Sequence, residues 1–376
     1  MHVTAELLSD SAALAADGSP AARHVAAFRA QGTPALIANA ACEVMLLRQG
    51  AARLPVTIDD GSRGRSYVSS PHSTYVLYPR DEIGLMGLGG VRYVAEGVLG
   101  LIAGLMRASR LSRAVHLDNW LLSTSLHGDW QGEGLAQMRR LLAARYPDHF
   151  IAIRSVDAWT CPALLDAVRA DGWTLLPARQ VWVTDDLERD WRVRSHTKAD
   201  ARMLRRSGLT LERPERIAPS DAARIAELYH QLYVARYSAI NPRFTPAFVT
   251  MSAETGLLAY SLLRNPAGEV MAFAALRCAG GVGTVPLMGY DTARPQEEAL
   301  YRIASYCATA LALERGLRFH GSAGASQFKR NRGARGIIEY MAVDGRHLSA
   351  PRRAALAVLA AGLNRFMVPM LESRGW

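Results

Sequence analysis

Short apolar stretches alternate with longer amphipathic stretches along most of the chain, which predicts a mixed, partly parallel sheet flanked by helices. Residues 66–79, SYVSSPHSTYVLYP, are rich in aromatic and β-branched residues and predict the first strand. The elements expected after it are a helix at 94–110, a strand at 114–126, a helix at 135–145, a strand at 150–156, a helix at 162–171 and a strand at 178–186.

The second half of the chain repeats this order of elements. A helix over 220–236 and a short helix precede three strands, and the text RNPAGE at 264–269 has the Asn-Pro and Gly signals of a hairpin. The strands are expected at 256–264, 269–278 and 282–291, followed by a helix at 297–315, strands at 317–322 and 336–343, and a terminal helix rich in Ala and Leu.

The length of 376 residues is too great for one ordinary hydrophobic core and predicts two domains. We expect an α/β (mixed α+β) fold with two tandem domains, each built on a mixed central sheet with helices on its faces. The expected ranges are a helical lead-in over 1–60, a first domain over 61–190 and a second domain over 191–376.

Composition narrows the class of protein. Hydrophobic residues make up 49% and charged residues 21%, as in ordinary folded proteins. The four cysteines form no CxxC pair and have no matching histidine spacing, so neither a metal site nor a disulfide framework is expected. The start MHVTAELLSD lacks a signal-peptide pattern, and Arg92 and Glu96 interrupt the most apolar stretch. We therefore expect a cytoplasmic protein without a membrane span.

A net charge of +10, carried mostly by arginine, favours anionic partners, although an arginine-rich composition alone gives the same sign. The charge is concentrated in WRVRSHTKADARMLRR, residues 191–206. On a helix, Arg194, Lys198, Arg202 and Arg205 share one face. This face is either a solvated surface or a phosphate-binding strip suited to a nucleic acid such as tRNA.

The text DWQGEGLAQM at 129–138 contains a local motif. Gln131, Gly134 and Ala136 fit the pattern Q/R-x-x-G-x-G/A, which resembles the pyrophosphate loop of the GNAT acetyltransferases. Small residues at a helix start let backbone N–H groups approach a phosphate, here that of coenzyme A. Glu133 places a negative charge in the same loop, so a coincidental match stays open.

Residues 287–343 carry a more specific resemblance. A strand, a long helix, a strand ending in small residues and the segment FKRNRG at 328–333 resemble the C-terminal domain of the bacterial Fem-type transferases. That resemblance covers about 191–343. It implies an acyl or aminoacyl transfer in the second domain, with Lys329 near the reacting carbonyl. Arg332 stands where the family commonly has an aromatic residue, which leaves the donor open.

The residues themselves support chemistry in this region. Acyl transfer to an amine builds negative charge on a carbonyl oxygen, and a fixed cation such as Lys329 lowers that barrier. Tyr290 and Asp291, at the end of an expected strand, are candidates for moving the amine proton. The alternatives are a surface basic turn for Lys329, an aromatic residue at the edge of the core for Tyr290 and a turn cap for Asp291.

Further positions are candidates for ligand contacts. For the phosphates of the acyl donor they are Ser322, Phe328, Arg330 and Arg332; for the acceptor they are Arg236, Tyr237 and Asn241.

The leading hypothesis is an N-acyltransferase that moves an acyl group from an acyl-CoA-type thioester to a small-molecule or peptide amine, without metal. An aminoacyl-tRNA donor of the Fem type and a catalytically silent binding module are the alternatives. The sequence leaves the oligomeric state open.

Overall fold

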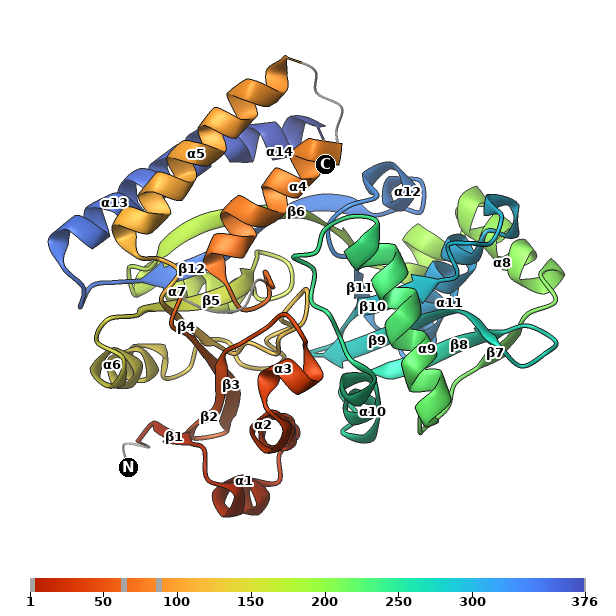
Figure 1. Cartoon of the computed structure of the whole chain (residues 1–376), viewed down its shortest axis with the longest axis horizontal. Coiled ribbons are helices and arrows are strands. Elements are labelled where there is room, and N and C mark those ends of the chain that lie inside the picture. Colours follow the sequence, from red (N-terminus) through yellow and green to blue (C-terminus); the bar gives the residue numbers. More distant parts are fainter. Residues whose placement is uncertain (1–3, 62–65, 86–89, 375–376) are drawn as a thin grey trace. The chain divides into compact units, whose positions relative to one another are not determined.

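The computed structural model describes residues 4–61, 66–85 and 90–374, and these fall into two compact units (Figure 1). The first unit contains the chain up to Arg179 and takes in Tyr237–Arg243 and Ile338–Ser373 as well. The second contains Gln180–Arg236 and Phe244–Ile337. The units therefore differ from the expected ranges 1–60, 61–190 and 191–376, because two later segments return to the first unit.

The first unit is built on a mixed sheet. Its strands follow the order β1 (Glu6–Leu8), β2 (Glu43–Gln49), β3 (Ala52–Asp59), β4 (Ala114–Leu117), β5 (Phe150–Val156), β12 (Arg335–Asp344) and β6 (Thr174–Thr184). The pair β4 and β5 is parallel, and β5 is antiparallel to β12. Ile151 and Ile153 face one side of the sheet and Phe150 and Ala152 the other, as the two-residue period of a strand requires.

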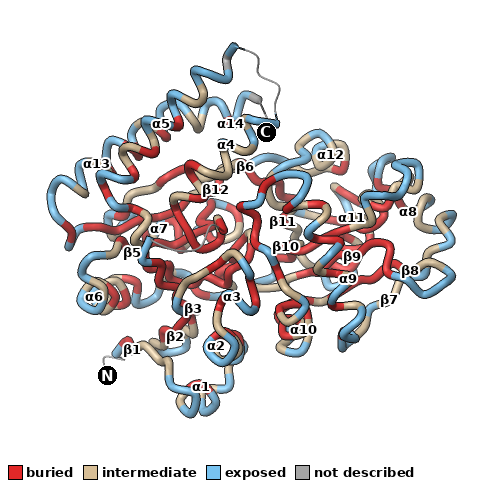
Figure 2. The backbone as a smooth tube through the Cα atoms, in the orientation of Figure 1, coloured by how far each residue is buried: buried red, intermediate tan, exposed pale blue. Residues whose placement is uncertain are grey.

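Helices cover both faces of this sheet. The helices α6 (Leu135–Arg145) and α7 (Pro162–Ala170) pack on the face of Ile151. The helices α5 (Val91–Ser109) and α13 (Ala350–Gly362) pack along each other and on the face of Phe150. Figure 2 shows the buried backbone concentrated in the strands between these layers.

The second unit repeats the arrangement. Its sheet runs from the end of β6 through β11 (Arg318–His320), β10 (Val282–Tyr290), β9 (Val270–Ala279) and β8 (Ala259–Arg264) to β7 (Thr210–Glu212). Again one pair, β10 with β11, is parallel. Met288 packs against α11 (Leu300–Glu314) on one face, while Gly289 approaches α9 (Pro219–Tyr229) on the other. Each unit thus has the mixed sheet of a GNAT-like domain, and the expected fold class is confirmed.

Further helices complete the part of the chain that the structure describes. They are α1 (Ser11–Asp17), α2 (Pro20–Gln31), α3 (Thr33–Leu36), α4 (Tyr78–Leu85), α8 (Ser195–Arg206), α10 (Pro246–Glu254), α12 (Ser326–Arg330), α14 (Val368–Arg374) and the turns of other helix types at Ser73–Leu77, Leu187–Arg192, His230–Ala235, Gln296–Glu298 and Leu363–Met367.

Two expectations for the N-terminal part are wrong. The segment 66–79 is a turn followed by helix, because Tyr75 and Val76 bury one side of a helical turn that the Ser70 side chain caps at Ser73. Residues 1–60 are more than a helical lead-in, since β2 and β3 form a hairpin at the start of the sheet. Leu46 in β2 and Val56 in β3 are fully buried there.

One helical stretch within the described residues, Ala350–Ser373, is long and apolar enough to cross a membrane by length and composition alone. Part of it packs in the core of the first unit, where Leu356 and Leu359 are buried.

Candidate functional site

The parallel strands of the second unit separate at their carboxyl ends. β10 and β11 pair only over Val282–Thr284 and Arg318–His320, and the register of β10 shifts between Thr284 and Leu287. β10 then continues to Tyr290 after β11 has ended. In the fold that the sequence resembles, the acyl donor enters where these two strands part.

A strained loop follows β11 at this place. Ser322 and Ala325 have φ angles of 59° and 48°, in the left-handed region that non-glycine residues avoid. Trp182 fixes the loop, because its N–H donates to the carbonyl oxygen of Ser322 at 3.1 Å and its own carbonyl accepts from Gly321 at 2.7 Å. Such strain is common at functional sites. In this loop a side-chain ammonium adds two further hydrogen bonds.

Lys329 supplies the ammonium that binds the strained loop. Its Nζ donates to the carbonyl oxygens of Ser322 at 3.2 Å and Ala323 at 2.7 Å. The ammonium is therefore fixed against the loop and half-buried, which differs from an exposed basic turn. A positive charge that is fixed in one position can stabilise negative charge that develops on a reacting group.

A row of aromatic rings connects Lys329's helix with the end of β10. The ring centroids of Tyr290 and Tyr301 are 6.2 Å apart, and those of Tyr301 and Phe328 are 5.2 Å apart. Arg236 donates from Nη1 to the Tyr290 hydroxyl at 3.2 Å. The structure thus brings together Tyr290, Phe328 and Arg236, which were all predicted, with Tyr301, which was missed. The available signal for Tyr301 was its place in the first turn of α11, the helix that follows β10.

Arg332 lies at the end of this row of rings, and other groups of the protein already bind its guanidinium. Its guanidinium carbon lies 3.5 Å from the centre of the Phe328 ring, and its Nε donates to Asp200 Oδ2 at 2.7 Å. Asp200 is buried and also accepts from Arg302 Nε at 2.8 Å. Arg332 is therefore a structural cation that orders the Phe328 segment, and a donor phosphate would have to displace Asp200 to reach it.

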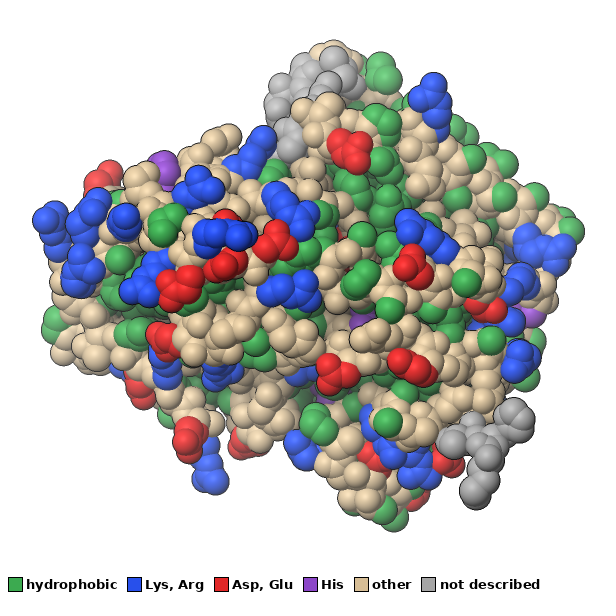
Figure 3. Space-filling view, turned by 180° about the vertical axis from the view of Figure 1, so that it is seen from behind, with side chains coloured by type: hydrophobic (Ala, Val, Ile, Leu, Met, Phe, Trp, Pro, Cys, Tyr) green, Lys and Arg blue, Asp and Glu red, His purple; other side chains and the backbone are tan. Residues whose placement is uncertain are grey.

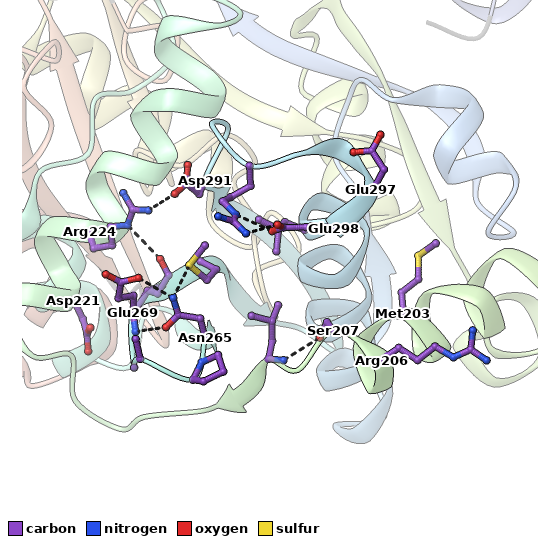
Figure 4. A pocket seen from close by; sticks show the side chains of 18 of the residues that line it. Met203, Arg206, Ser207, Asp221, Arg224, Asn265, Glu269, Asp291, Glu297 and Glu298 are labelled. Atoms are coloured by element: carbon purple, nitrogen blue, oxygen red, sulfur yellow. Dashed lines mark hydrogen bonds and ion pairs between the residues drawn. The ribbon is translucent and has the colours of Figure 1, made fainter.

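Asp291 lies at the edge of an open cavity of about 1170 Å³ in the second unit (Figure 4). One of its carboxylate oxygens accepts from Arg224 Nη2 at 2.8 Å and the other from the Ala293 N–H at 3.0 Å. Both oxygens are therefore engaged, and the geometry of this carboxylate matches the turn cap. The cavity is lined by five acidic and three basic side chains: Asp221, Glu269, Asp291, Glu297, Glu298, Arg206, Arg224 and Arg294.

The basic strip predicted at 191–206 is a real helix face. Arg194 precedes α8, and Lys198, Arg202 and Arg205 lie on it; all four are exposed. Arg194 Nε donates to the carbonyl oxygen of Asp190 at 2.9 Å. No ion pair joins any of these four side chains to a carboxylate in the part of the chain that the structure describes. The opposite face of α8 carries Asp200, which anchors it to α11 through Arg302.

The other residues that were predicted to contact a ligand lie outside the row of aromatic rings. Arg330 is exposed and lies over the Trp182 ring at 5.1 Å. Tyr237 is 47% exposed in the first unit. Asn241 is buried, donates to the carbonyl oxygen of Ser238 at 3.2 Å, and accepts from Asn39 Nδ2 at 2.8 Å through its backbone carbonyl. Asn241 therefore holds its own loop and is not available to an acceptor.

The loop of Gln131, Gly134 and Ala136 begins α6 in the first unit, as predicted, with Gly134 at φ 75°. The position where this loop would bind a phosphate is already occupied, because Glu133 Oε2 accepts from the Gln131 N–H at 3.0 Å. The side chain of Gln49 lies against Gly134. A diphosphate would have to displace both groups.

In the first unit, the protein's own side chains and backbone occupy the space where β4 and β5 separate. Arg154 Nη1 donates to the Val68 carbonyl at 3.1 Å, to Asn119 Oδ1 at 3.1 Å and to the Leu122 carbonyl at 3.3 Å. Leu121 and Leu122 are fully buried beside it. Burial lowers the pKa of the Arg154 guanidinium to about 10. This interior was not foreseen from the sequence, and it leaves the second unit as the better candidate for acyl transfer.

No group of three or more metal-ligating His, Cys, Asp or Glu side chains occurs among the described residues. No family model matches the chain, and no curated protein matches its sequence. Solved structures give weak matches. L-PGS from Bacillus licheniformis is 12% identical, with 67% of this chain and 82% of that chain covered and a TM-score of 0.46.

The chain resembles GNAT-fold proteins. FemX is 12% identical over 56% of this chain and 75% of its own, with a TM-score of 0.43. A tandem GNAT protein from the clavulanic acid biosynthesis pathway is 13% identical over 91% of this chain and 99% of its own, with a TM-score of 0.39. The strand order of each unit, and not these scores, supports the GNAT-like fold.

Proposed function

We propose that this chain is an acyltransferase that moves an activated acyl or aminoacyl group to an amine by direct attack at the end of β10 in the second unit. The C–N bond forms as the ester or thioester bond of the donor breaks, and the tRNA hydroxyl or the thiol leaves. Lys329 would stabilise the negative charge on the carbonyl oxygen, and Tyr290 would take part in moving the amine proton. The observation that carries this proposal is the fixed ammonium of Lys329 on the strained loop 321–325, beside the row of Tyr290, Tyr301 and Phe328.

The charge distribution favours aminoacyl-tRNA over coenzyme A as the donor. In the fold that the sequence resembles, a coenzyme A diphosphate binds at the start of the helix after the central strand. In the second unit that helix is α11, and Glu297 and Glu298 lie directly before it. In the first unit Glu133 occupies the loop. The strip on α8, by contrast, offers four exposed cations to a polyanion.

A tRNA-binding experiment tests the donor. We would replace Arg194, Lys198, Arg202 and Arg205 together by Ala and compare this variant with an equally charge-reduced control. Arg23, Arg140, Arg145 and Arg169 are exposed in the first unit and provide that control. Fluorescence anisotropy with bulk tRNA should show at least a tenfold weaker Kd for the strip variant near 0.15 M salt. Its salt slope should be smaller by about three, while the control stays near wild type.

A single-turnover experiment tests the chemistry. Labelled aminoacyl-tRNA and, separately, an acyl-CoA thioester are mixed with the full chain and a small amine, and amide formation is followed. Lys329→Gln and Tyr290→Phe should each slow the transfer, by roughly 100-fold for the lysine, with tRNA affinity retained. Equal losses of transfer and of affinity would contradict a catalytic part for Lys329. Binding without transfer from either donor would identify a silent binding module instead.

A further inference from the structure

Exposed large hydrophobic side chains are concentrated on a few helices of the first unit. Among the described residues, eight of the ten lie on α4, α5 and the stretch Ala350–Ser373: Leu85, Tyr93, Val94, Val98, Leu101, Val358, Phe366 and Met370. The other two are Val193 and Tyr237. Scattered apolar side chains need no explanation, but a concentration on packed neighbours marks an interaction surface.

The helix α5 is apolar on its outer as well as its inner side. Leu99, Ala103 and Met106 are buried against the core of the first unit. Val94, Val98 and Leu101 follow the helical spacing on the other side and are exposed, Leu101 at 67%. The glycines at 97, 100 and 104 have open space beside them, which exposes further apolar helix surface.

The stretch Ala350–Ser373 has the same construction. Leu356, Leu359 and Leu363 face the core, whereas Val358, Phe366 and Met370 are exposed, Phe366 at 74%. Since α5 and α13 pack along each other, their outer sides belong to one region (Figure 1). Figure 3 shows hydrophobic side chains with a few basic side chains among them over the upper part of the molecule. We call the outer sides of α5 and of Ala350–Ser373 the apolar helix face.

The charge of these helices indicates what the face binds. The ranges 91–110 and 350–373 hold six arginines, Arg92, Arg107, Arg110, Arg352, Arg353 and Arg365, against two glutamates, Glu96 and Glu372. Arg92 pairs with Glu96, and Arg352 and Arg353 donate to backbone carbonyl oxygens of the first unit, while Arg107, Arg110 and Arg365 are exposed. Apolar side chains bordered by arginines suit the headgroup region of an anionic bilayer, which attracts each basic residue near its surface. A second copy of the chain fits less well, because two-fold pairing would bring two positively charged faces together.

We propose that the apolar helix face docks on an anionic lipid surface, lying in the headgroup region without crossing the bilayer. A spanning arrangement of Ala350–Ser373 would have to pull Leu356, Leu359 and Leu363 out of the core of the first unit. An interfacial arrangement leaves that core intact and buries only side chains that are already exposed.

Vesicle flotation with the full chain tests this proposal. The vesicles are pure phosphatidylcholine or phosphatidylcholine with 30% phosphatidylglycerol. The test variant is Leu101→Glu with Phe366→Glu. The control, Val193→Glu with Gln296→Glu, adds the same charge at exposed positions of the second unit. We expect binding to the anionic vesicles that weakens as salt rises, at least a tenfold loss for the test variant, and wild-type binding for the control.

Three results would overturn the proposal. One is wild-type binding by the test variant, and another is equal binding to neutral and anionic vesicles. The third is a dimer in analytical ultracentrifugation that the test variant dissociates, with no vesicle binding, which would assign the face to a second copy. Because both substituted side chains are exposed, circular dichroism and Tm should stay unchanged. A Tyr93→Trp variant gives an independent readout, since brominated lipid should quench its added fluorescence if the face is seated in the bilayer.

Discussion

Asp200 is a buried acidic side chain that pairs with two arginines of the second unit, and its replacement should destabilise that unit. Its side chain is 2% exposed and lies between Arg302 and Arg332, whose side chains are 32% and 9% exposed. Asp200→Asn keeps the volume and removes the charge, so the change isolates electrostatics from cavity formation. Breaking a buried pair costs about 3–5 kcal/mol, and water around Arg302 lowers that figure, so we expect a loss of about 3 kcal/mol.

Urea unfolding followed by tryptophan fluorescence and circular dichroism measures this loss. The matched control is Glu188→Gln, because Glu188 pairs with Arg192 at 2.9 Å with both side chains exposed, and its loss should stay below about 0.5 kcal/mol. If the uncompensated charge is the cause, Arg302→Met and Arg332→Met in the Asp200→Asn background should restore most of the stability. A loss below about 1 kcal/mol for Asp200→Asn would refute the reasoning.

Three further changes test the interior. Burial alone would lower the pKa of His127, but its hydrogen bond at 2.7 Å to Asp118 and the charge of that carboxylate raise it. The stabilisation lost in His127→Gln should therefore be largest below pH 6.5 and shrink as the pH rises through the folded-state pKa. Burial lowers the pKa of His116 to about 3. Wild type should then lose stability as the pH falls below 6.5, and His116→Leu should lose less between pH 7 and pH 5 in thermal melts. Gly289→Ala would place a Cβ 2.6 Å from the Leu228 carbonyl carbon, so urea titration should show a loss of about 2 kcal/mol or more, whereas Gly97→Ala, with open space, should be neutral or stabilising.

Local sequence patterns predicted the elements whose borders have strong signals. The helix at 135–145 and the strand at 150–156 have the predicted bounds, because a glycine precedes the helix and the strand begins with four apolar residues. The segment 66–79 failed because aromatic and β-branched residues fit a strand and a buried helical turn equally well over so few positions. In the N-terminal part, the alanine-rich stretches hid the hairpin of β2 and β3.

Long-range arrangements were beyond the sequence. No local pattern predicted that residues 340–344 pair with β5, or that 237–243 belong to the first unit, because both depend on contacts between distant segments. The same holds for Asp200, whose partners lie more than 100 residues away. By contrast, the order of strands and helices, together with the resemblance, predicted that the end of β10 lies near the segment after β11, which carries Phe328 and Lys329.

Arg332 stands where the Fem-type transferases that the sequence resembles commonly have an aromatic residue, and its contacts show how an arginine fits this position. An aromatic residue at this position would stack on Phe328, and the planar guanidinium of Arg332 does so at 3.5 Å. Unlike an aromatic ring, it also pairs with Asp200. Asp200 lies on the inner side of α8, opposite the exposed Lys198 and Arg202. The arginine therefore connects the helix that we propose for tRNA with the segment that carries Lys329. Arg332→Phe, which keeps the stacking, should consequently cost stability without removing the aromatic row, and Arg332→Lys should recover part of the pairing but little of the stacking.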